Sequence, residues 1–326
     1  MDNSPNLIGP DFEQPVVELD KKIKIEKEKS HPDYDRIDRL ETEKKNLIEE
    51  IFSNLSSWQK VQLARHPNRP HTMDYIKGIF EDFIEFHGDR KFGDDKAIVG
   101  GMASLNSESV MLIGHQKGET TEDNLNRNFG MPHPEGYRKS LRLMKLAEKF
   151  SIPVITFVDT PGAYPGIEAE ERGQAEAIAT NLKEMMNLKT GIITVIIGEG
   201  GSGGALGIGV GDKLLMLENS VYFVCTPEAC SAILWKDAQK ASQAAETMGL
   251  TSQDLKKLGI IDKIIKEPAG GAHWDYPAMF ETLKLGLTRQ LGALKRTKNK
   301  NLFEKRFKKF RNIGEYRKIN SSGNRR

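Results

Sequence analysis

The chain has 326 residues, of which 38% are hydrophobic and 29% are charged, so it can form one large domain or two ordinary ones around a substantial core. It contains no apolar run of about 18 residues, which excludes a membrane-spanning helix, and residues 1–5 lack the pattern of a secretory signal. The only cysteines are Cys225 and Cys230, too few for a disulfide framework and without zinc-ribbon spacing. We therefore expect them to pack in the core, and we expect no metal site and a reducing cytoplasm.

The net charge of +2 is unevenly distributed. Residues 295–326 hold 13 Lys and Arg against 2 Glu, a net charge of +11, which leaves −9 for the rest of the chain. Such a tail can bind nucleic acid, an acidic protein or a phosphorylated ligand. The simpler expectation is a solvated, partly disordered terminus, and a nucleic-acid-binding protein is an unlikely alternative.

Residues 12–54 have the pattern of two amphipathic helices separated by a break at residues 30–33. Because two thin helices bury little surface alone, a solvated hairpin and a coiled-coil arm for a partner both remain open. We divide the chain into an N-terminal helical hairpin at 1–56, a main domain at 57–294 and a basic C-terminal tail at 295–326. The apolar positions that define the two helices are Val16, Leu19, Ile23, Ile37, Leu40, Leu47, Ile48 and Ile51.

The main domain mixes short β-branched runs with amphipathic segments, and pairs of strands tend to precede a helix. This order favours a layered α/β fold built from ββα units. The predicted strands are 97–103, 110–114, 153–158, 192–197, 213–217 and 221–225, and the predicted helices are 74–87, 135–150, 169–186, one that starts at Pro227, and 276–293.

A glycine-rich segment at residues 198–209, here called the glycine turn, follows the predicted buried strand 192–197 and leads into a short predicted helix. Because glycine has no Cβ, a ligand can approach the backbone N–H groups closely. Free N–H groups at a helix start suit an anion. The segment therefore predicts a site for an oxyanion or a phosphate, and three motifs compete for it.

In the first interpretation, residues 200–204 form the G-x-S-x-G motif of an acyl hydrolase, with Ser202 as the nucleophile. The triad then needs an acid and a histidine. His273 is the one histidine downstream, and Asp237 is a possible acid.

In the second interpretation, Gly198, Gly200 and Gly203 match the dinucleotide fingerprint, and Glu218 lies 20 residues after Gly198, where a ribose-binding acid belongs. Only residues 204–212 are available for the crossover helix, which is too short for a βαβ unit.

In the third interpretation, backbone N–H groups of a Gly-Gly pair stabilise an enolate or an oxyanion, and no nucleophilic side chain is needed. A second glycine-containing turn, residues 159–166, also follows a predicted strand and precedes a helix. Two such turns at one edge of a sheet would wall a pocket, with Tyr164 as part of the wall or as a hydrogen-bond donor.

Motifs along nearly the whole chain carry a family resemblance. They are residues 64–70, 87–90, 94–101, 113–118, 127–132, 134–139, 159–166, 169–174, the glycine turn, 226–228, 267–268 and 270–273. Together they cover residues 12 to about 290, and this part of the chain resembles the α-subunit family of the multi-subunit acetyl-CoA carboxylase carboxyltransferases. The basic tail lies outside these motifs.

The resemblance implies a crotonase/ClpP-like ββα superhelix and the transfer of a carboxyl group from carboxybiotin to acetyl-CoA, which gives malonyl-CoA for fatty acid synthesis. It implies a β subunit in an α2β2 unit, a biotin carboxyl carrier protein and a biotin carboxylase as partners. Biotin is then carried on the separate carrier protein, and the complex is associated with ATP binding. The zinc ribbon of such enzymes belongs to the β subunit.

The resemblance also assigns residues. Gly203 and Gly204 would form the oxyanion hole for the ureido oxygen of biotin, and we expect Gly207→Ala, one turn later, to be mild. Lys117, Arg138 and Arg172 are candidates for the phosphates of CoA by motif position only, and His115 and His273 are expected to be structural. The expected substrate-binding residues are Gly162, Ala163, Tyr164, Gly200 and Gly201.

Overall fold

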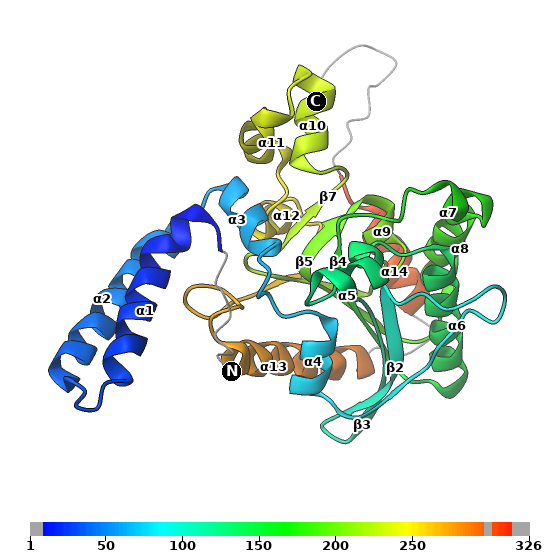
Figure 1. The fold of residues 1–326 in the computed structure, drawn as a ribbon. Helices are drawn as coiled ribbons and strands as arrows, with labels where there is room; N and C mark the ends of the chain where they lie inside the picture. The colour runs from blue at the N-terminus through cyan, green and yellow to red at the C-terminus, as the bar shows by residue number, and fades with distance from the viewer. Residues whose placement is uncertain (1–8, 297–301, 315–326) are drawn as a thin grey trace, which may run out of the picture.

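The computed structural model describes residues 9–296 and 302–314. Its centre is an eight-stranded sheet in the order β1-β2-β3-β4-β5-β6-β8, with β7 paired to the end of β5 (Figure 1). β1, β2 and β3 are antiparallel, and all pairs from β3 onward are parallel. The strands are β1 (Glu81–Glu85), β2 (Ile98–Leu105), β3 (Glu108–His115), β4 (Val154–Thr160), β5 (Ile192–Gly201), β6 (Lys213–Leu217), β7 (Val221–Phe223) and β8 (Lys263–Ile265).

Helices cover both faces of this sheet. In β4, Ile155 and Phe157 pack with α4 and α13 on one face, whereas Val154 and Val158 pack with α6 and α8 on the other, as the two-residue period of a strand requires. The helices are α1 (Gln14–Lys27), α2 (Tyr34–Ser53), α3 (Ser57–Ala64), α4 (Thr72–Ile79), α5 (Thr121–Asn126), α6 (Pro134–Phe150), α7 (Ile167–Glu171), α8 (Gln174–Asn187), α9 (Ser202–Leu206), α10 (Pro227–Trp235), α11 (Ala241–Met248), α12 (Ser252–Lys257), α13 (Tyr276–Lys295) and α14 (Leu302–Arg311).

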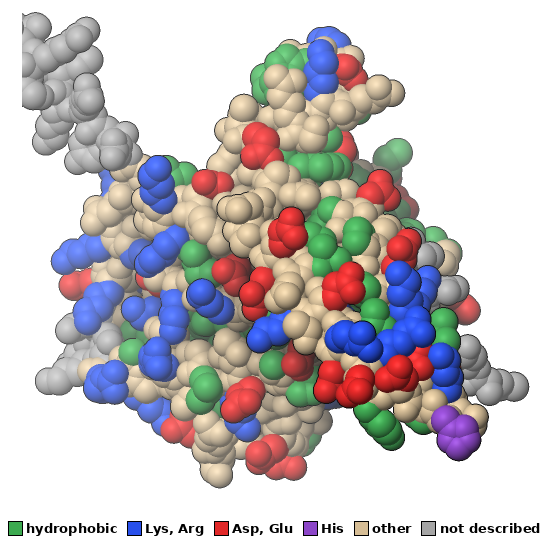
Figure 2. Space-filling view, turned by 90° about the vertical axis from the view of Figure 1, so that its left-hand side faces the viewer, with side chains coloured by type: hydrophobic (Ala, Val, Ile, Leu, Met, Phe, Trp, Pro, Cys, Tyr) green, Lys and Arg blue, Asp and Glu red, His purple; other side chains and the backbone are tan. Residues whose placement is uncertain are grey.

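The N-terminal hairpin of α1 and α2 is present as predicted and projects from the main body (Figure 1). Asp33, in the predicted break, caps α2 by accepting the N–H of Arg36. Figure 2 views the molecule from the hairpin side, where basic and acidic side chains intermingle over the surface. Within residues 9–296 and 302–314, no helix is long and apolar enough to cross a membrane.

The helix predicted at 74–87 is wrong in its second half. α4 ends at Ile79, and residues 81–85 form β1, which pairs with β2 at the edge of the sheet. Phe80, Phe83 and Phe86 are spaced three residues apart, which fits a helix, so pairing with the edge of β2 overrides the local pattern here. Asp82 adopts a φ of +53°, which interrupts the register of β1 at that point.

The helix predicted at 169–186 is split, and the strand predicted at 192–197 is longer than expected. Gly173 adopts a φ of +83° between α7 and α8, a conformation that favours glycine and ends the first helix. β5 continues through the first glycines of the glycine turn to Gly201, because β4 and β7 both pair with it there. The first third of the predicted turn, residues 198–201, is therefore strand, and the short predicted helix is α9.

The basic C-terminal segment is not a solvated tail where the structure describes it. α14 packs on the main domain, and Arg306 is only 1% exposed. Its guanidinium donates to both oxygens of Asp212, at 3.0 and 2.7 Å, and to the backbone carbonyls of Met185, Leu188 and Thr190. Residues 297–301 and 315–326, the rest of the predicted tail, lie outside the described residues, as do residues 1–8.

We expect Arg306→Ala to lower the free energy of unfolding by about 3–5 kcal/mol, because it leaves the Asp212 carboxylate buried without its partner. Urea unfolding followed by circular dichroism measures this loss. Lys308→Ala, on the exposed side of the same helix, is the control and should change the free energy by about 0.5 kcal/mol or less. Equal losses for the two variants would contradict the anchoring role of Arg306.

Candidate functional site

The two glycine-containing turns meet at the carboxyl edge of the sheet, where β4 and β5 lie parallel with Thr160 opposite Gly200. A Cβ atom on Gly204 would lie 2.6 Å from the nitrogen of Ala163 and 2.7 Å from the oxygen of Gly162. The turns therefore touch backbone to backbone, and only glycine fits at position 204. The predicted meeting of the two turns is what the structure shows.

The N–H groups of Gly203 and Gly204 belong to the first turn of α9, where a helix provides no internal acceptor. In the described part of the chain, neither N–H group makes a hydrogen bond. Gly203 also faces open space, since a Cβ atom there would find only Ile178, 3.6 Å away. Gly203 is thus open to a ligand, whereas Gly204 is buried against the second turn.

An apolar groove of about 290 Å³ begins at this position. Its wall is formed by the end of β7 and by α9 and α12, and one side chain on its rim, Val224, is 84% exposed. The residues that line it are Ser202, Gly203, Leu206, Tyr222, Phe223, Val224, Leu255 and Ile260. A ligand that reaches Gly203 can bury apolar surface in this groove.

The predicted substrate-binding residues fall into two groups. Gly162, Ala163 and Tyr164 are partly exposed in the second turn, and the Tyr164 ring stacks on His133 with the ring centroids 4.2 Å apart. Gly200 and Gly201 are buried within β5, with the ring of Tyr222 directly over Gly200. Only the first group lies where a ligand can touch it directly.

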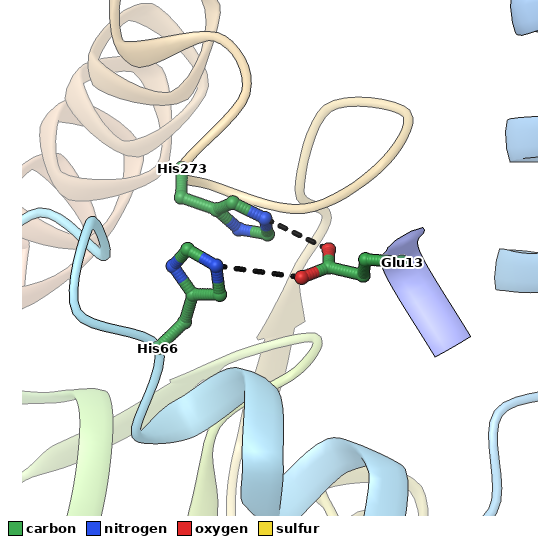
Figure 3. Close-up of side chains that lie close together, drawn as sticks. All are labelled: Glu13, His66 and His273. Atoms are coloured by element: carbon green, nitrogen blue, oxygen red, sulfur yellow. Dashed lines mark hydrogen bonds and ion pairs between the residues drawn. The ribbon is translucent and has the colours of Figure 1, made fainter. Parts of the chain in front are cut away.

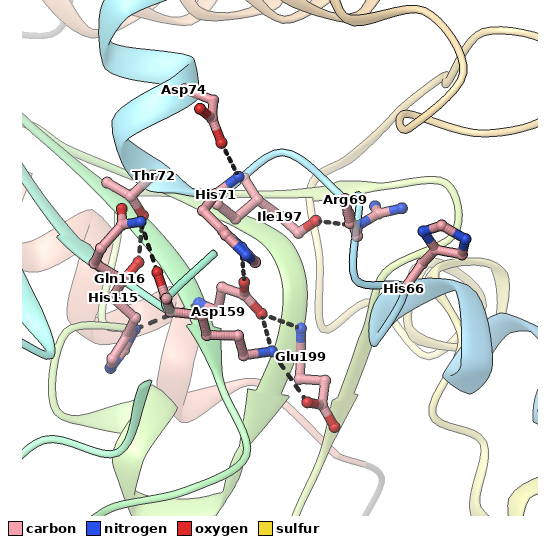
Figure 4. Close-up of polar contacts among 12 residues, drawn as sticks. His66, Arg69, His71, Thr72, Asp74, His115, Gln116, Asp159, Ile197 and Glu199 are labelled. Carbon is pink, nitrogen blue, oxygen red and sulfur yellow. Dashed lines mark hydrogen bonds and ion pairs between the residues drawn. The ribbon is translucent and has the colours of Figure 1, made fainter. Parts of the chain in front are cut away.

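A buried ionic network lies beneath the turns (Figure 4). Lys117 donates to Asp159 at 2.7 Å and to Glu199 at 3.1 Å, and the N–H of Glu199 donates to Asp159 at 3.0 Å. Burial opposes ionisation of Asp159, but Lys117 and His71 outweigh it and hold the pKa of this carboxyl well below its usual range. The network ties the end of β3 to the ends of β4 and β5.

Lys117, Arg138 and Arg172 are therefore engaged within the chain instead of being free for phosphates. Lys117 is committed to the two carboxylates beneath the turns. Arg138 pairs with Asp89 at 2.8 Å and with Glu135 at 3.0 Å, and Arg172 pairs with Glu135 at 2.8 Å. All three side chains have partners within the chain, which favours a structural role over binding of the CoA phosphates.

The sequence alone suggested no role for Arg65 and Arg69, although both lie in the family motif at residues 64–70. Arg65 donates to Glu199 and to Glu228, at 2.6 Å each, and so extends the network to the first turn of α10. Arg69 donates to both oxygens of Glu267. Their partners are more than a hundred residues away in sequence, so no local signal could have identified them.

The hydrolase interpretation lacks a base. Ser202 is exposed with a φ of +49°, but His273 is engaged elsewhere, with its Nε2 atom 2.9 Å from Glu13 Oε1. His115 is fully buried, and burial lowers its pKa to about 4. The dinucleotide interpretation fails as expected, because α9 is only five residues long.

Glu13, His66 and His273 bring three potential metal ligands within 4.8 Å of one another, and we call this cluster the clasp (Figure 3). The N–H of Asn68 donates to Nδ1 of His66 at 3.1 Å, so this nitrogen has no proton. A neutral His66 then has its proton on Nε2, facing Glu13. Histidine ligands instead bind metal through an unprotonated nitrogen and donate from the other one, so the clasp fits hydrogen bonding better than metal binding.

Gly207 does not tolerate a side chain, contrary to the expectation from sequence. A Cβ atom there would lie 2.5 Å from the ring of Tyr137, which is fully buried. Gly207→Ala would therefore disturb the packing between α9 and α6, and Gly204→Val would clash with the second turn. Gly203 is the position in this turn where a side chain fits without a clash.

A family model described as acetyl co-enzyme A carboxylase carboxyltransferase-like matches residues 10–314. The chain belongs to this family. Among curated relatives, proteins of Geobacter metallireducens and Thiobacillus denitrificans are 57% and 53% identical over 309 and 311 residues, which cover 94% of this chain and 97% of each relative. Both are named acetyl-coenzyme A carboxylase carboxyl transferase subunit alpha, so the predicted family is confirmed.

Solved structures of carboxyltransferases and decarboxylases share the fold of this family member. Transcarboxylase 12S aligns with a TM-score of 0.53 at 19% identity, and the alignment covers 66% of this chain and 42% of the transcarboxylase chain. A Pseudomonas malonate decarboxylase hetero-tetramer in complex with coenzyme A aligns with a TM-score of 0.55 at 15% identity. The alignment covers 67% of this chain and 86% of the decarboxylase chain. This chain thus spans less than half of the transcarboxylase chain. The likeness confirms the predicted crotonase-like fold.

We expect Lys117→Met to lower the free energy of unfolding at pH 7 by about 3–5 kcal/mol, because the Asp159 carboxylate stays buried without its cation, whereas Glu199 keeps its pair with Arg65. Since the folded-state pKa of Asp159 is depressed, its contribution is present above about pH 4 and is lost as the pH falls further. The difference between the variant and the original chain should therefore narrow below about pH 4.

Urea unfolding between pH 7 and pH 3 tests this expectation. Lys145→Met, on α6, removes a half-exposed ion pair with Glu184 of α8 and should change the free energy by about 0.5 kcal/mol or less at every pH. A Lys117→Met difference that stays constant with pH would show that Asp159 is not held ionised by Lys117.

Proposed function

We propose that the two turns form this chain's part of an active site that transfers a carboxyl group from carboxybiotin to acetyl-CoA, giving malonyl-CoA. The observation that carries the proposal is the pair of N–H groups at Gly203 and Gly204 that make no hydrogen bond, of which Gly203 lines an apolar groove. The family and its α-subunit relatives support the same reaction. In our proposal, this reaction belongs to the first committed step of fatty acid synthesis.

Biotin supplies a ureido oxygen on which negative charge builds as the carboxyl group leaves. In our proposal, the N–H groups of Gly203 and Gly204 donate to this oxygen. The backbone contact with Gly162 and Ala163 fixes the direction of the donors before the substrate arrives, and fixed donors cost no reorganisation during the reaction. The loss of one such donor typically costs about 10²–10³ in rate.

No carboxylate or imidazole from the described residues lines the groove beside Gly203. The proton that leaves the methyl group of acetyl-CoA therefore passes, in our proposal, to the biotin nitrogen that carried the carboxyl group. Gly162, Ala163 and Tyr164 form the opposite wall of the site. Gly200 and Gly201 contribute by allowing β5 to lie close against β7 and the second turn.

We further propose the complex implied by the sequence. A β subunit completes an α2β2 unit and supplies the donors for the thioester, and a biotin carboxyl carrier protein and a biotin carboxylase deliver carboxybiotin. Biotin then reaches this chain on the carrier and is not attached to it. The comparisons give no support to ATP binding by this chain, and the cytoplasm is the compartment we propose.

We expect Gly203→Val to lower kcat by about 100-fold while assembly with the β subunit is retained. Its side chain would enter the open space beside the donors, where the substrate has to lie, without a clash with the protein. The control is Gly93→Val, which also faces open space but lies far along the chain. Turnover by the assembled complex, with size-exclusion chromatography for assembly, measures both effects.

If Gly203→Val assembles and turns over like Gly93→Val, the oxyanion hole does not lie at this turn. A fluorophosphonate probe provides the complementary test for Ser202. Stoichiometric labelling of Ser202, together with loss of activity in Ser202→Ala, would support the hydrolase alternative instead.

We also expect the purified chain to be nearly inactive alone, because only one pair of free donors is identified in its described residues. Malonyl-CoA formation from carboxybiotin should appear when a β subunit is added. The carboxyl-exchange assay with and without the β subunit measures this difference. Full activity of the chain alone would refute the division of the site between two subunits.

A further inference from the structure

Residues 65–71, here called the strap, connect α3 to α4 and contain two prolines, Pro67 and Pro70, which restrict the backbone. Three side chains of the strap reach the ends of the two strands that carry the site, and Figure 4 shows two of them, Arg69 and His71. Arg65 donates to Glu199 at 2.6 Å, Arg69 donates to the carbonyl of Ile197 at 2.7 Å, and His71 Nδ1 lies 3.3 Å from Asp159 Oδ2.

The fourth side chain of the strap, His66, points the other way, into the clasp (Figure 3). Its Nε2 atom lies 3.4 Å from Glu13 Oε2, and its ring stacks on that of His273 with the centroids 4.0 Å apart. Glu13 also accepts from Trp274 Nε1 at 3.4 Å. All three clasp side chains are about 1% exposed, so water does not replace these contacts.

Glu13 is the group that determines how His66 is held. Because the N–H of Asn68 occupies Nδ1 of His66, the Nε2–H of His66 needs an acceptor. It makes no hydrogen bond in the structure, and Glu13 Oε2 lies 3.4 Å from it. Glu13 Oε1 binds His273 at 2.9 Å, and the ring of His273 stacks on that of His66. The backbone of Gly9 closes over this contact, since a Cβ atom there would lie 2.9 Å from Glu13 Oε2 and 3.1 Å from His66 Nε2. The clasp therefore has little freedom to adjust.

We infer that Glu13, which lies before the first helix of the hairpin and outside the active site, is a positioning residue for carboxyl transfer. It holds His66, and with it the strap, in the register that places Arg65, Arg69 and His71 against β4 and β5. The glycine turn follows directly from β5, so a displaced strap displaces the donors of Gly203 and Gly204. This inference rests on the proposed function for its catalytic readout.

The test is Glu13→Gln, which keeps the size of the side chain but removes its negative charge and one of its two acceptor oxygens, so the group can no longer accept from both sides of the clasp. We expect kcat of the complex with the β subunit to fall by about 10-fold, with KM changed by about twofold or less. We also expect faster hydrogen exchange at residues 66–71 and 197–201 of the variant. The control is Glu18→Gln, an exposed position on α1, which should leave both readouts unchanged.

A double-mutant cycle with His71→Asn separates coupling from general damage. Glu13 and His71 share no partner, so independent effects would multiply. If the strap couples Glu13 and His71, the fold-loss in kcat of the double variant should be clearly smaller than the product of the fold-losses of the two single variants. A multiplicative loss, or unchanged hydrogen exchange at 197–201 in Glu13→Gln, would overturn the inference.

Two further outcomes are informative. Glu13→Asp keeps the charge but shortens the side chain, so it should show the same pattern if Glu13→Gln fails to fold. Full activity of Glu13→Asp would count against the inference.

A metal ion present in stoichiometric amount and lost in Glu13→Gln would assign the clasp to metal binding instead. Hydrogen exchange does not depend on activity, so it tests the coupling even if the assembled complex proves to be no carboxyltransferase.

Discussion

The site depends on a backbone contact between two turns, at which Gly204 lies against Gly162 and Ala163. A side chain on Gly204 would force the turns apart, and their separation decides where the free N–H groups of α9 point. The parallel pairing of β4 and β5 brings the turns to the same edge of the sheet. A shift of register between Val158 and Thr160 then brings Thr160 opposite Gly200 instead of Gly198, where regular pairing would place it.

The ionic network beneath this contact explains how it keeps its geometry. Lys117 binds acids from two different strands, and Arg65 extends the same chain of charges to α10. Buried ion pairs contribute little net stability, since the desolvation of the charges offsets their attraction. Here the ion pairs fix the geometry of the site. Lys117 and Arg65 each bind carboxylates from two elements, so neither side chain can move without losing a partner.

Local sequence was sufficient for the parts of the fold that depend on neighbours along the chain. The buried β-branched runs, the hairpin break at Asp33 and the two glycine-containing turns all follow from composition and spacing. The segment 74–87 was predicted wrongly in its second half because Phe80, Phe83 and Phe86 have a helical spacing, and pairing with the edge of β2, which no local pattern reveals, makes it a strand. Gly173 divided a predicted helix through its positive φ, which a helical pattern does not reveal.

The parts of the site that sequence did not reveal are contacts between distant segments. Glu13 and His273 are 260 residues apart, and Arg65 and Glu199 are 134 residues apart. A motif shows that a charged residue is present but not which partner satisfies it, and so Lys117 was a candidate for a phosphate although two carboxylates bind it. The role of Gly207 was misjudged for the same reason, because Tyr137 comes from a helix on another part of the chain.

The anchoring of α14 by Arg306 has a consequence for synthesis of the chain on the ribosome. Asp212, the partner of Arg306, is made 94 residues earlier. At a synthesis rate of about 5–20 residues per second, Asp212 waits roughly 5–20 s for its partner. Throughout that interval the carbonyls of Met185, Leu188 and Thr190 also lack their final donor. The sheet can begin to form during translation, but this side of the domain is completed only once α14 has been made.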